Sequence, residues 1–349
     1  MNPKVFAAVL MLASFILAHA AATTGADFTS TRAAFLRVID RPRVSLAPEV
    51  RKLSETNGIA KFHFTFATDA EQRVPGILLK PTKSTGRSPA VILLHGTGGT
   101  KDSDSFRPFQ EAFVNAGFMA VAIDGRYHGE RTKTGSGATE YNDAIFRAYR
   151  TGKEHPFYYD TVWDVMRLID YLETRDDIDP RQIGLIGFSK GGIETYLATA
   201  ADPRIAAAVP CIGVQSFRWG LDNGQWKARV ATIQDAFDSA AKDAGVKQVN
   251  ADFVRRFYDR VVPGIYDQFD GPAMLPLIAP RPLLVINGDS DANTPMAGVR
   301  LSAEAARLAY HAEQADAKFV LRIQENTGHT LTTESREAAI EWLVRWLKK

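Results

Sequence analysis

At residues 183–197 the chain reads IGLIGFSKGGIETYL, in which a short apolar run passes through a G-x-S-x-G turn into a helical pattern. A turn this tight between a strand and a helix needs Gly187 and Gly191 on either side of Ser189, because side chains there would clash. Such a turn holds the serine hydroxyl out above the sheet. The motif therefore predicts a strand, a nucleophile turn and a helix, which is one unit of a parallel α/β sheet.

Short apolar runs of the same kind recur along the chain, separated by segments with helical periodicity. Strands that are buried on both faces have this composition, so the runs predict a mostly parallel sheet with helices on both faces. Two stretches that precede them have the pattern of half-buried strands. The predicted strands lie at residues 61–68, 73–80, 90–94, 119–123, 183–186, 205–209, 283–286 and 319–323. The sequence thus predicts an α/β fold with a roughly eight-stranded sheet.

The connection between the sixth and seventh of these strands is unusually long. More than seventy residues separate Val209 from Leu283, which is far more than a strand-helix-strand connection needs. We therefore predict a helical insertion, a lid, at about residues 216–278. Two apolar stripes inside it predict one amphipathic helix each, at Val230, Ile233 and Phe237 and at Val254, Phe257 and Val261.

The insertion also holds more aromatic residues than two short helices need for their packing. Substrate pockets are mostly apolar and aromatic, so we expect some of these side chains to line one, Trp219 and Trp226 in particular. The alternative, that both tryptophans belong to the core, stays open at this point.

A serine hydroxyl is a weak nucleophile, so Ser189 needs a base to take its proton and a third group to orient that base. The order expected along such a chain is serine, then acid, then histidine. Two histidines follow Ser189: His311 lies in a helix-like run, where a solvated side chain is the ordinary interpretation, and His329 lies on a loop after the last predicted strand. The carboxyl ends of the strands are where a parallel α/β sheet places its site. His329 is therefore the predicted base.

Two aspartates in the loop after the strand at 283–286 compete for the role of the acid. Asp291 lies further into the loop, whereas Asp289 is close to the end of the strand and would brace the turn. We favour Asp291, although the triad requires one acid and does not choose between the two.

A tetrahedral intermediate also needs backbone N–H donors, one from the residue after the nucleophile and one from the loop after the third strand of the sheet. Lys190 supplies the first. The second is expected from the glycine-rich stretch HGTGG at residues 95–99, with Thr97 as the first choice and Gly98 behind it.

The remaining polar residues near the strand ends raise the question of a metal. His95, Asp124 and His128 are conceivable ligands, but no HExxH-type spacing supports them, and a polar network that braces the loops is the favoured interpretation. Cys211 is the only cysteine, which excludes an intramolecular disulfide and paired-cysteine zinc sites and predicts a buried, inert thiol. We predict no metal.

The charge of the chain is nearly balanced, with 42 Lys and Arg against 40 Asp and Glu and no block of one sign. Nothing in this pattern indicates binding to nucleic acid or anionic lipid.

The first twenty residues have the pattern of a signal peptide. Lys4 is followed by an apolar run at residues 5–17 and by Ala18-His19-Ala20 as a cleavage site. We expect cleavage near Ala20/Ala21 and a secreted or periplasmic chain without stable membrane association. Residues 21–60 are then a helix and linker region before a hydrolase domain at residues 61–349.

Together these motifs resemble the α/β-hydrolase superfamily, and most closely the branch that contains dienelactone hydrolases, acetylxylan esterases and the catalytic domains of prolyl oligopeptidases. The resemblance covers roughly residues 61–349. The motifs that carry it are His95-Gly96, residues 124–129, Asp179 leading into Ile183, residues 187–192, Pro280-Arg281-Pro282-Leu283-Leu284, Asp291 with Thr294-Pro295, and Gly328-His329. The resemblance implies hydrolysis of an ester, thioester or peptide bond through an acyl-enzyme, without a cofactor.

The leading hypothesis is a serine esterase that acts on small or sugar-linked acyl esters. Dienelactone hydrolases use a cysteine where this chain has Ser189, so their substrate is not favoured. A peptidase or amidase is the alternative, weakened because fewer than fifty residues lie between the predicted cleavage site and Lys61, too few for the propeller of prolyl oligopeptidases. A binding protein on the same fold is the third hypothesis, and the complete set of triad residues argues against it.

Overall fold

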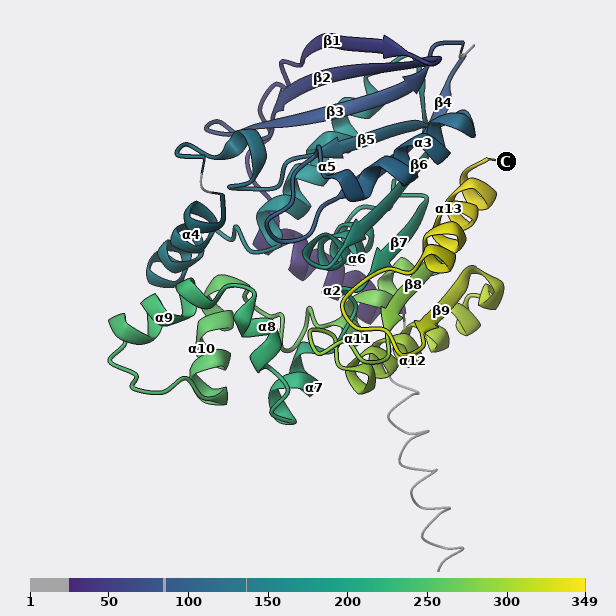
Figure 1. The fold of residues 1–349 in the computed structure, drawn as a ribbon. Coiled ribbons are helices and arrows are strands. Elements are labelled where there is room, and N and C mark those ends of the chain that lie inside the picture. Colours follow the sequence, from purple (N-terminus) through teal and green to yellow (C-terminus); the bar gives the residue numbers. More distant parts are fainter. Residues whose placement is uncertain (1–24, 84–85, 136, 349) are drawn as a thin grey trace, which may run out of the picture.

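The computed structural model describes residues 25–83, 86–135 and 137–348, which form a nine-stranded sheet in the order β1-β2-β3-β5-β4-β6-β7-β8-β9 (Figure 1). The strands are β1 (Glu49–Thr56), β2 (Ile59–Ala67), β3 (Arg73–Pro81), β4 (Ser88–Leu94), β5 (Met119–Ile123), β6 (Ile178–Phe188), β7 (Ala207–Cys211), β8 (Leu283–Gly288) and β9 (Phe319–Gln324). The pairs from β5 to β9 are parallel, and β1, β2 and β3 extend the sheet antiparallel. The predicted mostly parallel sheet is confirmed.

β1 is the one strand of the sheet that the sequence did not predict. It lies within residues 21–60, which were expected to hold a helix and a linker, and only α2 (Gly25–Ile39) matches that expectation. All side chains of β1 are exposed, so no apolar alternation marks the strand in the sequence. The strand is defined by its antiparallel backbone pairing with β2 and not by its side chains.

Helices cover both faces of the sheet, as predicted (Figure 1). Those outside the insertion are α3 (Arg107–Asn115), α4 (Gly137–Thr151), α5 (Tyr159–Glu173), α6 (Lys190–Ala201), α12 (Met296–Ala312) and α13 (Thr333–Leu347), with the short 3-10 helices η1 (Asp104–Phe106), η2 (Gly129–Arg131) and η4 (Asp316–Lys318). α2, α5 and α6 lie on one face, whereas α3 and α13 lie on the other.

The central strands are buried on both faces. In β4, Ala90, Ile92 and Leu94 join the core that includes side chains of α5 and α6. Val91 and Leu93 of the same strand join the core beneath α3 and α13. This alternation explains why the strand has a continuous apolar sequence without a polar face.

The connection between β7 and β8 is the predicted helical insertion. It consists of α7 (Phe217–Asp222), α8 (Lys227–Ala231), α9 (Gln234–Asp243), α10 (Ala251–Val261), α11 (Gly271–Met274) and η3 (Leu275–Ile278). Of these, α9 and α10 pack against α4 (Figure 1). The predicted single helix through Val230, Ile233 and Phe237 is wrong, because the backbone at Ile233 is not helical and separates α8 from α9. All three side chains are nevertheless buried, so the bend satisfies the same apolar pattern.

The predicted signal peptide and the predicted buried thiol can also be compared with the structure. The predicted signal peptide, residues 1–20, lies outside the described residues. In the ranges that the structure does describe, none of the helices combines the length and apolar character needed to cross a membrane. The Cys211 side chain is buried at the end of β7, and burial raises the pKa of its thiol.

A buried ionic network fixes the loop that follows β5. Asp164 of α5 accepts hydrogen bonds from Arg126 at 3.1 and 3.2 Å, from Arg131 at 2.5 Å and from Thr68 at 2.8 Å. Burial alone would raise the pKa of Asp164, but the two arginines outweigh it and lower the pKa to about 2. The carboxylate therefore ties the loop and η2 to α5.

Replacing Asp164 by Asn should lower the free energy of unfolding by about 3–5 kcal/mol, because two buried guanidinium groups lose their counter-charge. Urea unfolding at neutral pH measures this. In the wild type, the contribution of Asp164 should be present above pH 4 and should be lost as the pH falls through about 2, since its folded-state pKa is the depressed one. Asp104→Asn is the matched control, because its ion pair with Arg107 is exposed and should change stability by less than about 1 kcal/mol. Equal losses in both variants would contradict a structural role for the buried network.

Candidate active site

The turn between β6 and α6 holds Ser189 in a strained backbone conformation, with φ of 56° and ψ of −113°. The glycines around it are required by close backbone contacts. A Cβ atom on Gly187 would lie 2.2 Å from the carbonyl oxygen of Gly191, and one on Gly191 would lie 2.3 Å from the carbonyl oxygen of Leu94. The predicted clash of side chains at these two positions is confirmed.

Three loops at the carboxyl ends of β6, β8 and β9 bring Ser189, Asp291 and His329 together. His329 Nε2 lies 2.7 Å from Ser189 Oγ, and His329 Nδ1 lies 2.7 Å from Asp291 Oδ2. With the proton on Nδ1, the imidazole donates to the carboxylate and its Nε2 accepts from the serine hydroxyl. The His329 side chain is 28% exposed, whereas that of Asp291 is fully buried.

Further hydrogen bonds hold the Asp291 carboxylate in place. Its Oδ1 accepts from the backbone N–H of Asn293 at 2.8 Å, and its Oδ2 also accepts from the Thr294 hydroxyl at 2.7 Å. Burial alone would raise the pKa of Asp291, but the hydrogen bonds from His329 and Thr294 outweigh it and keep the pKa below its ordinary value. The carboxylate is therefore ionised at neutral pH.

Asp289 serves the neighbouring loop instead. Its two carboxylate oxygens accept from the backbone N–H groups of Asn326 at 3.0 Å and Thr327 at 3.1 Å. These residues directly precede Gly328 and His329, so Asp289 fixes the loop that carries the histidine. Of the two aspartates left open by the sequence, the geometry brings Asp291 to the imidazole.

The loop after β4 lies against Ser189. A Cβ atom on Gly96 would be 3.4 Å from the Cβ of Ser189. Within the described part of the chain, the backbone N–H groups of Thr97 and Lys190 have no acceptor, whereas that of Gly98 donates to His128 Nε2 at 3.2 Å. The Lys190 side chain turns away to a buried ion pair with Glu194 at 2.7 Å. Thr97 and Lys190 are thus the free donors, and Gly98 is already engaged.

Two neutral histidines brace this loop. His95 Nδ1 donates to the Gly96 carbonyl at 2.7 Å and its Nε2 accepts from the Gly125 N–H at 3.0 Å. His128 Nδ1 donates to the Arg126 carbonyl at 2.7 Å. Burial lowers the pKa of both imidazoles, that of His128 to about 3, so each can accept a hydrogen bond at neutral pH.

Asp124, the third residue of the set considered for a metal, has a similar bracing role. It accepts from the backbone N–H of Lys101 at 2.8 Å, from its ammonium group at 2.9 Å and from the backbone N–H of Glu130 at 3.0 Å. No group of three or more His, Cys, Asp or Glu residues suited to a metal occurs in the stretches that the structure describes.

The two tryptophans predicted to contact substrate lie in different places. Trp219 lines a surface pocket of about 360 Å³ together with Asp289 and Asp291. Trp226 packs against the main core and lines a small cavity of about 10 Å³. Neither Ser189 nor His329 is among the described residues that line these two cavities.

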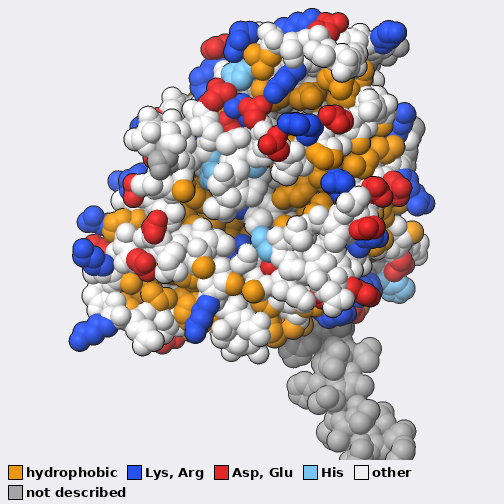
Figure 2. Space-filling model, in the orientation of Figure 1, with side chains coloured by type: hydrophobic (Ala, Val, Ile, Leu, Met, Phe, Trp, Pro, Cys, Tyr) orange, Lys and Arg blue, Asp and Glu red, His pale blue; other side chains and the backbone are white. Residues whose placement is uncertain are grey.

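Hydrophobic side chains also gather in a hollow near the centre of the face in Figure 2, with histidines beside it.

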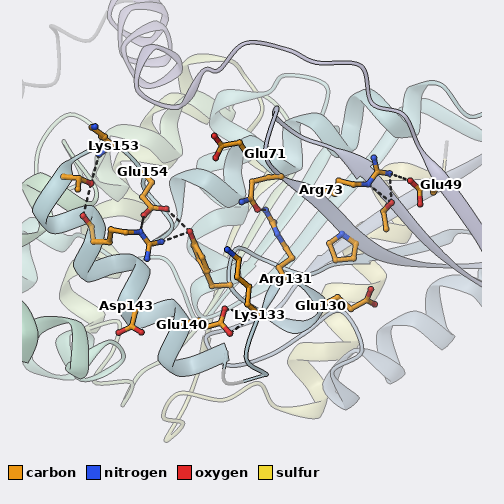
Figure 3. Close-up of a pocket in the computed structure, with 16 residues that line it drawn as sticks. Glu49, Glu71, Arg73, Glu130, Arg131, Lys133, Glu140, Asp143, Lys153 and Glu154 are labelled. Carbon is orange, nitrogen blue, oxygen red and sulfur yellow. Dashed lines mark hydrogen bonds and ion pairs between the residues drawn. The ribbon is translucent and has the colours of Figure 1, made fainter.

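A larger pocket, which the sequence did not indicate, lies between the edge of the antiparallel strands and α4 (Figure 3). Its volume is about 1040 Å³, and most of its lining side chains are charged, among them Glu49 and Arg73. At one side the Tyr127 hydroxyl donates to Glu154 at 2.9 Å and accepts from Arg147 at 2.9 Å. Because β1 is wholly exposed and has no apolar pattern, this wall of the pocket could not be predicted from the sequence.

Comparison with known proteins decides the family. A family model described as "Acetyl xylan esterase (AXE1)" matches residues 23–217, more than half of the chain, including the loop at 95–99 and Ser189. The chain belongs to the acetyl xylan esterase family. It is a carboxylic-ester hydrolase, as the leading hypothesis from the sequence expected. The match ends before Asp291 and His329.

Individual relatives resemble this esterase in sequence or in fold. The putative hydrolase YtaP of Bacillus subtilis (strain 168) is 27% identical over 291 residues, which are 80% of this chain and 85% of that protein. Acetyl xylan esterase 1 from Thermoanaerobacterium sp. JW/SL YS485 superposes with a TM-score of 0.68 at 18% identity, covering 93% of this chain and 94% of that one. A glucuronoyl esterase from Solibacter usitatus gives a TM-score of 0.59 at 16% identity, covering 90% and 92%. The two structural likenesses confirm the predicted α/β-hydrolase fold.

The tight packing around Ser189 of this esterase predicts a loss of stability for any side chain at Gly191. Gly191→Ala should lower the free energy of unfolding by about 3 kcal/mol, because the new methyl group meets the fixed carbonyl of Leu94. Thermal and urea unfolding measure the loss. Gly220→Ala in α7 is the control, since its nearest contact would be 3.8 Å away, and it should leave stability unchanged or raise it by up to about 1 kcal/mol. A tolerated Gly191→Ala would refute the contact.

Proposed function

We propose that this esterase cleaves its substrate through an acyl-enzyme on Ser189, with His329 as the base and Asp291 as the residue that orients the base. The observation that carries the proposal is the unbroken chain of two 2.7 Å contacts from Asp291 through His329 to Ser189. A base oriented by a third group is what a serine hydroxyl needs to become a nucleophile.

In the first half of the reaction, His329 Nε2 takes the proton of Ser189 Oγ while Oγ attacks the carbonyl carbon of the ester. The imidazolium that forms is stabilised by Asp291 and then gives its proton to the oxygen of the departing alcohol. In the second half, His329 takes a proton from water, whose oxygen attacks the acyl-enzyme. Collapse of that intermediate returns the proton to Ser189 and releases the carboxylic acid.

The negative charge on the tetrahedral intermediate would be met by two backbone N–H groups, those of Thr97 and Lys190. Both are free among the described residues, and the loop of Thr97 packs against Ser189. His95 and His128 keep that loop in place from behind. Donors that are fixed before the reaction need no reorganisation when the charge develops.

The proposed substrates are small or sugar-linked acyl esters, acetylated glycans foremost. The family match and the named acetyl xylan esterase and glucuronoyl esterase relatives support this class. Trp219, beside the acid loop, would contact the bulky part of such an ester. A peptide amide is the competing substrate, and it would use the same three side chains.

The proposal includes the organisation of the chain. Residues 1–20 would be removed as a signal peptide near Ala20/Ala21, which places the enzyme in the periplasm or outside the cell. Residues 61–349 would form the catalytic domain, with a lid at about residues 216–278. The apolar run of the first twenty residues and the helical insertion beside the site support these assignments.

Asp291→Asn should reduce kcat on an aryl acetate by roughly 10⁴-fold, because the amide cannot hold the tautomer of His329 that accepts the serine proton. Asp289→Asn should reduce it far less, since that carboxylate bonds only backbone and a serine hydroxyl near the loop. Initial rates at saturating ester measure both, and circular dichroism checks the fold of each variant. The reverse order of losses would assign the acid to Asp289 and contradict the proposal.

Alanine variants of the two tryptophans should distinguish a role in substrate contact from a role in packing. Trp219→Ala should raise KM for a bulky ester more than for an acetate ester and leave the melting temperature nearly unchanged, because Trp219 lines an open surface pocket. Trp226→Ala should instead lower the melting temperature, because Trp226 packs against the core. Parallel kinetics on bulky esters, acetate esters and peptide amides, with differential scanning fluorimetry, measure these effects. Equal losses on every ester in Trp219→Ala would remove it from the substrate pocket.

A further inference from the structure

The insertion contains a buried guanidinium group without a counter-charge. Arg229 of α8 is 6% exposed. Its Nη2 donates to the carbonyl of Asn293 at 2.8 Å. The amide oxygen of Gln215, when turned toward the guanidinium, accepts from Nε at 3.2 Å and from Nη2 at 3.1 Å. Across the described ranges no carboxylate lies within 4.0 Å of Arg229, and its Nη1 has no acceptor. Buried charges are normally paired, so this group calls for an anion.

Buried phenol groups around Arg229 show the same lack of acceptors. Tyr158, Tyr196 and Tyr258 are fully buried, and none of their hydroxyl groups has a hydrogen-bond partner among the described residues. Burial raises the pKa of each phenol, and the positive charge of Arg229 opposes that rise in all three. The three side chains therefore lie within the field of the same guanidinium. A buried donor left unpaired costs about 1–3 kcal/mol, and of the three hydroxyl groups only that of Tyr258 belongs to a residue that lines a cavity with Arg229.

Arg229 and Tyr258 line one small cavity, whose wall is partly aromatic and which reaches the surface at the exposed Gln225. Trp226 and Tyr266 form part of its wall, and Gln215 forms another part. Its volume is about 10 Å³, which is the space of about one water molecule. α7, α8 and α10 supply half of this lining, and they lie together at one end of the molecule (Figure 1).

We propose that this cavity binds one monovalent anion of about the size of chloride, held by Arg229 Nη1 and the Tyr258 hydroxyl. A cavity whose free polar groups are a cation and hydroxyl donors favours a ligand that accepts hydrogen bonds and carries negative charge. A water molecule would satisfy the hydroxyl but would leave the guanidinium charge uncompensated. A carboxylate of several heavy atoms exceeds the volume of the cavity.

The anion would act on the site through Arg229. The same guanidinium holds the carbonyl of Asn293, two residues after Asp291. A ligand that neutralises Arg229 therefore stabilises the packing of α8 against the loop of the acid. The halide should raise the melting temperature of the protein, because it binds the folded state alone.

The direct test is a bromide soak of crystals of the full chain, read by anomalous diffraction. We expect an anomalous peak within hydrogen-bond distance of Arg229 Nη1 and the Tyr258 hydroxyl. Acetate and gluconate soaks are the comparison, and neither should place density there. Bromide peaks elsewhere with none in this cavity, or acetate density in it, would overturn the proposal.

Variants extend the test to solution. Replacing gluconate by chloride at constant ionic strength should raise the melting temperature of the wild type by a few degrees, and this response should vanish in Arg229→Gln. Tyr258→Phe keeps the ring and should weaken the midpoint for chloride about tenfold or more, as expected for the loss of one hydrogen bond to an ion. Arg256→Gln removes an exposed arginine of the same insertion and should respond as the wild type does. If Tyr258→Phe also responds as the wild type does, the anion is not in this cavity.

Discussion

The close approach of three backbone segments around Ser189 is the constraint on which the structure depends. The carbonyl groups of Leu94 and Gly191 lie so near their neighbours that Gly187 and Gly191 can carry no side chain. This packing forces Ser189 into its left-handed conformation and aims its hydroxyl out of the turn. It also sets the position of the loop after β4, because Gly96 rests on Ser189. Ser189, the proposed nucleophile, and the proposed oxyanion donors are therefore positioned by the same backbone packing.

Hydrogen bonds and ion pairs of polar side chains hold the surrounding loops in place around Ser189. The neutral His95 and His128 connect the loop after β4 to the loop after β5, and Asp164 connects the latter to α5. Asp289 fixes the loop of His329 by accepting two of its backbone N–H groups. Each brace uses a group whose charge state the fold itself maintains, with lowered pKa values for the imidazoles and for Asp164. Rigid placement of this kind is what preorganised electrostatic stabilisation requires.

Much of this arrangement could be predicted from the sequence because short local motifs determine it. The strand, turn and helix at 183–197 and the two later loops indicated Ser189, Asp291 and His329, which the structure brings together. β1 could not be found, because its side chains are all exposed and only pairing with β2 defines it. The break between α8 and α9 was missed because a bend buries the same apolar residues as a helix. The unpaired Arg229 is a tertiary property and has no local signature.

The measurement that tests the central claim most directly is mass spectrometry of the protein after reaction with a fluorophosphonate, followed by digestion and mapping of the labelled peptide. The account predicts one covalent adduct on Ser189, at a rate that falls sharply when His329 is replaced by Ala, because the hydroxyl then has no base. An adduct on another residue, or labelling of Ser189 at an unchanged rate without His329, would contradict it.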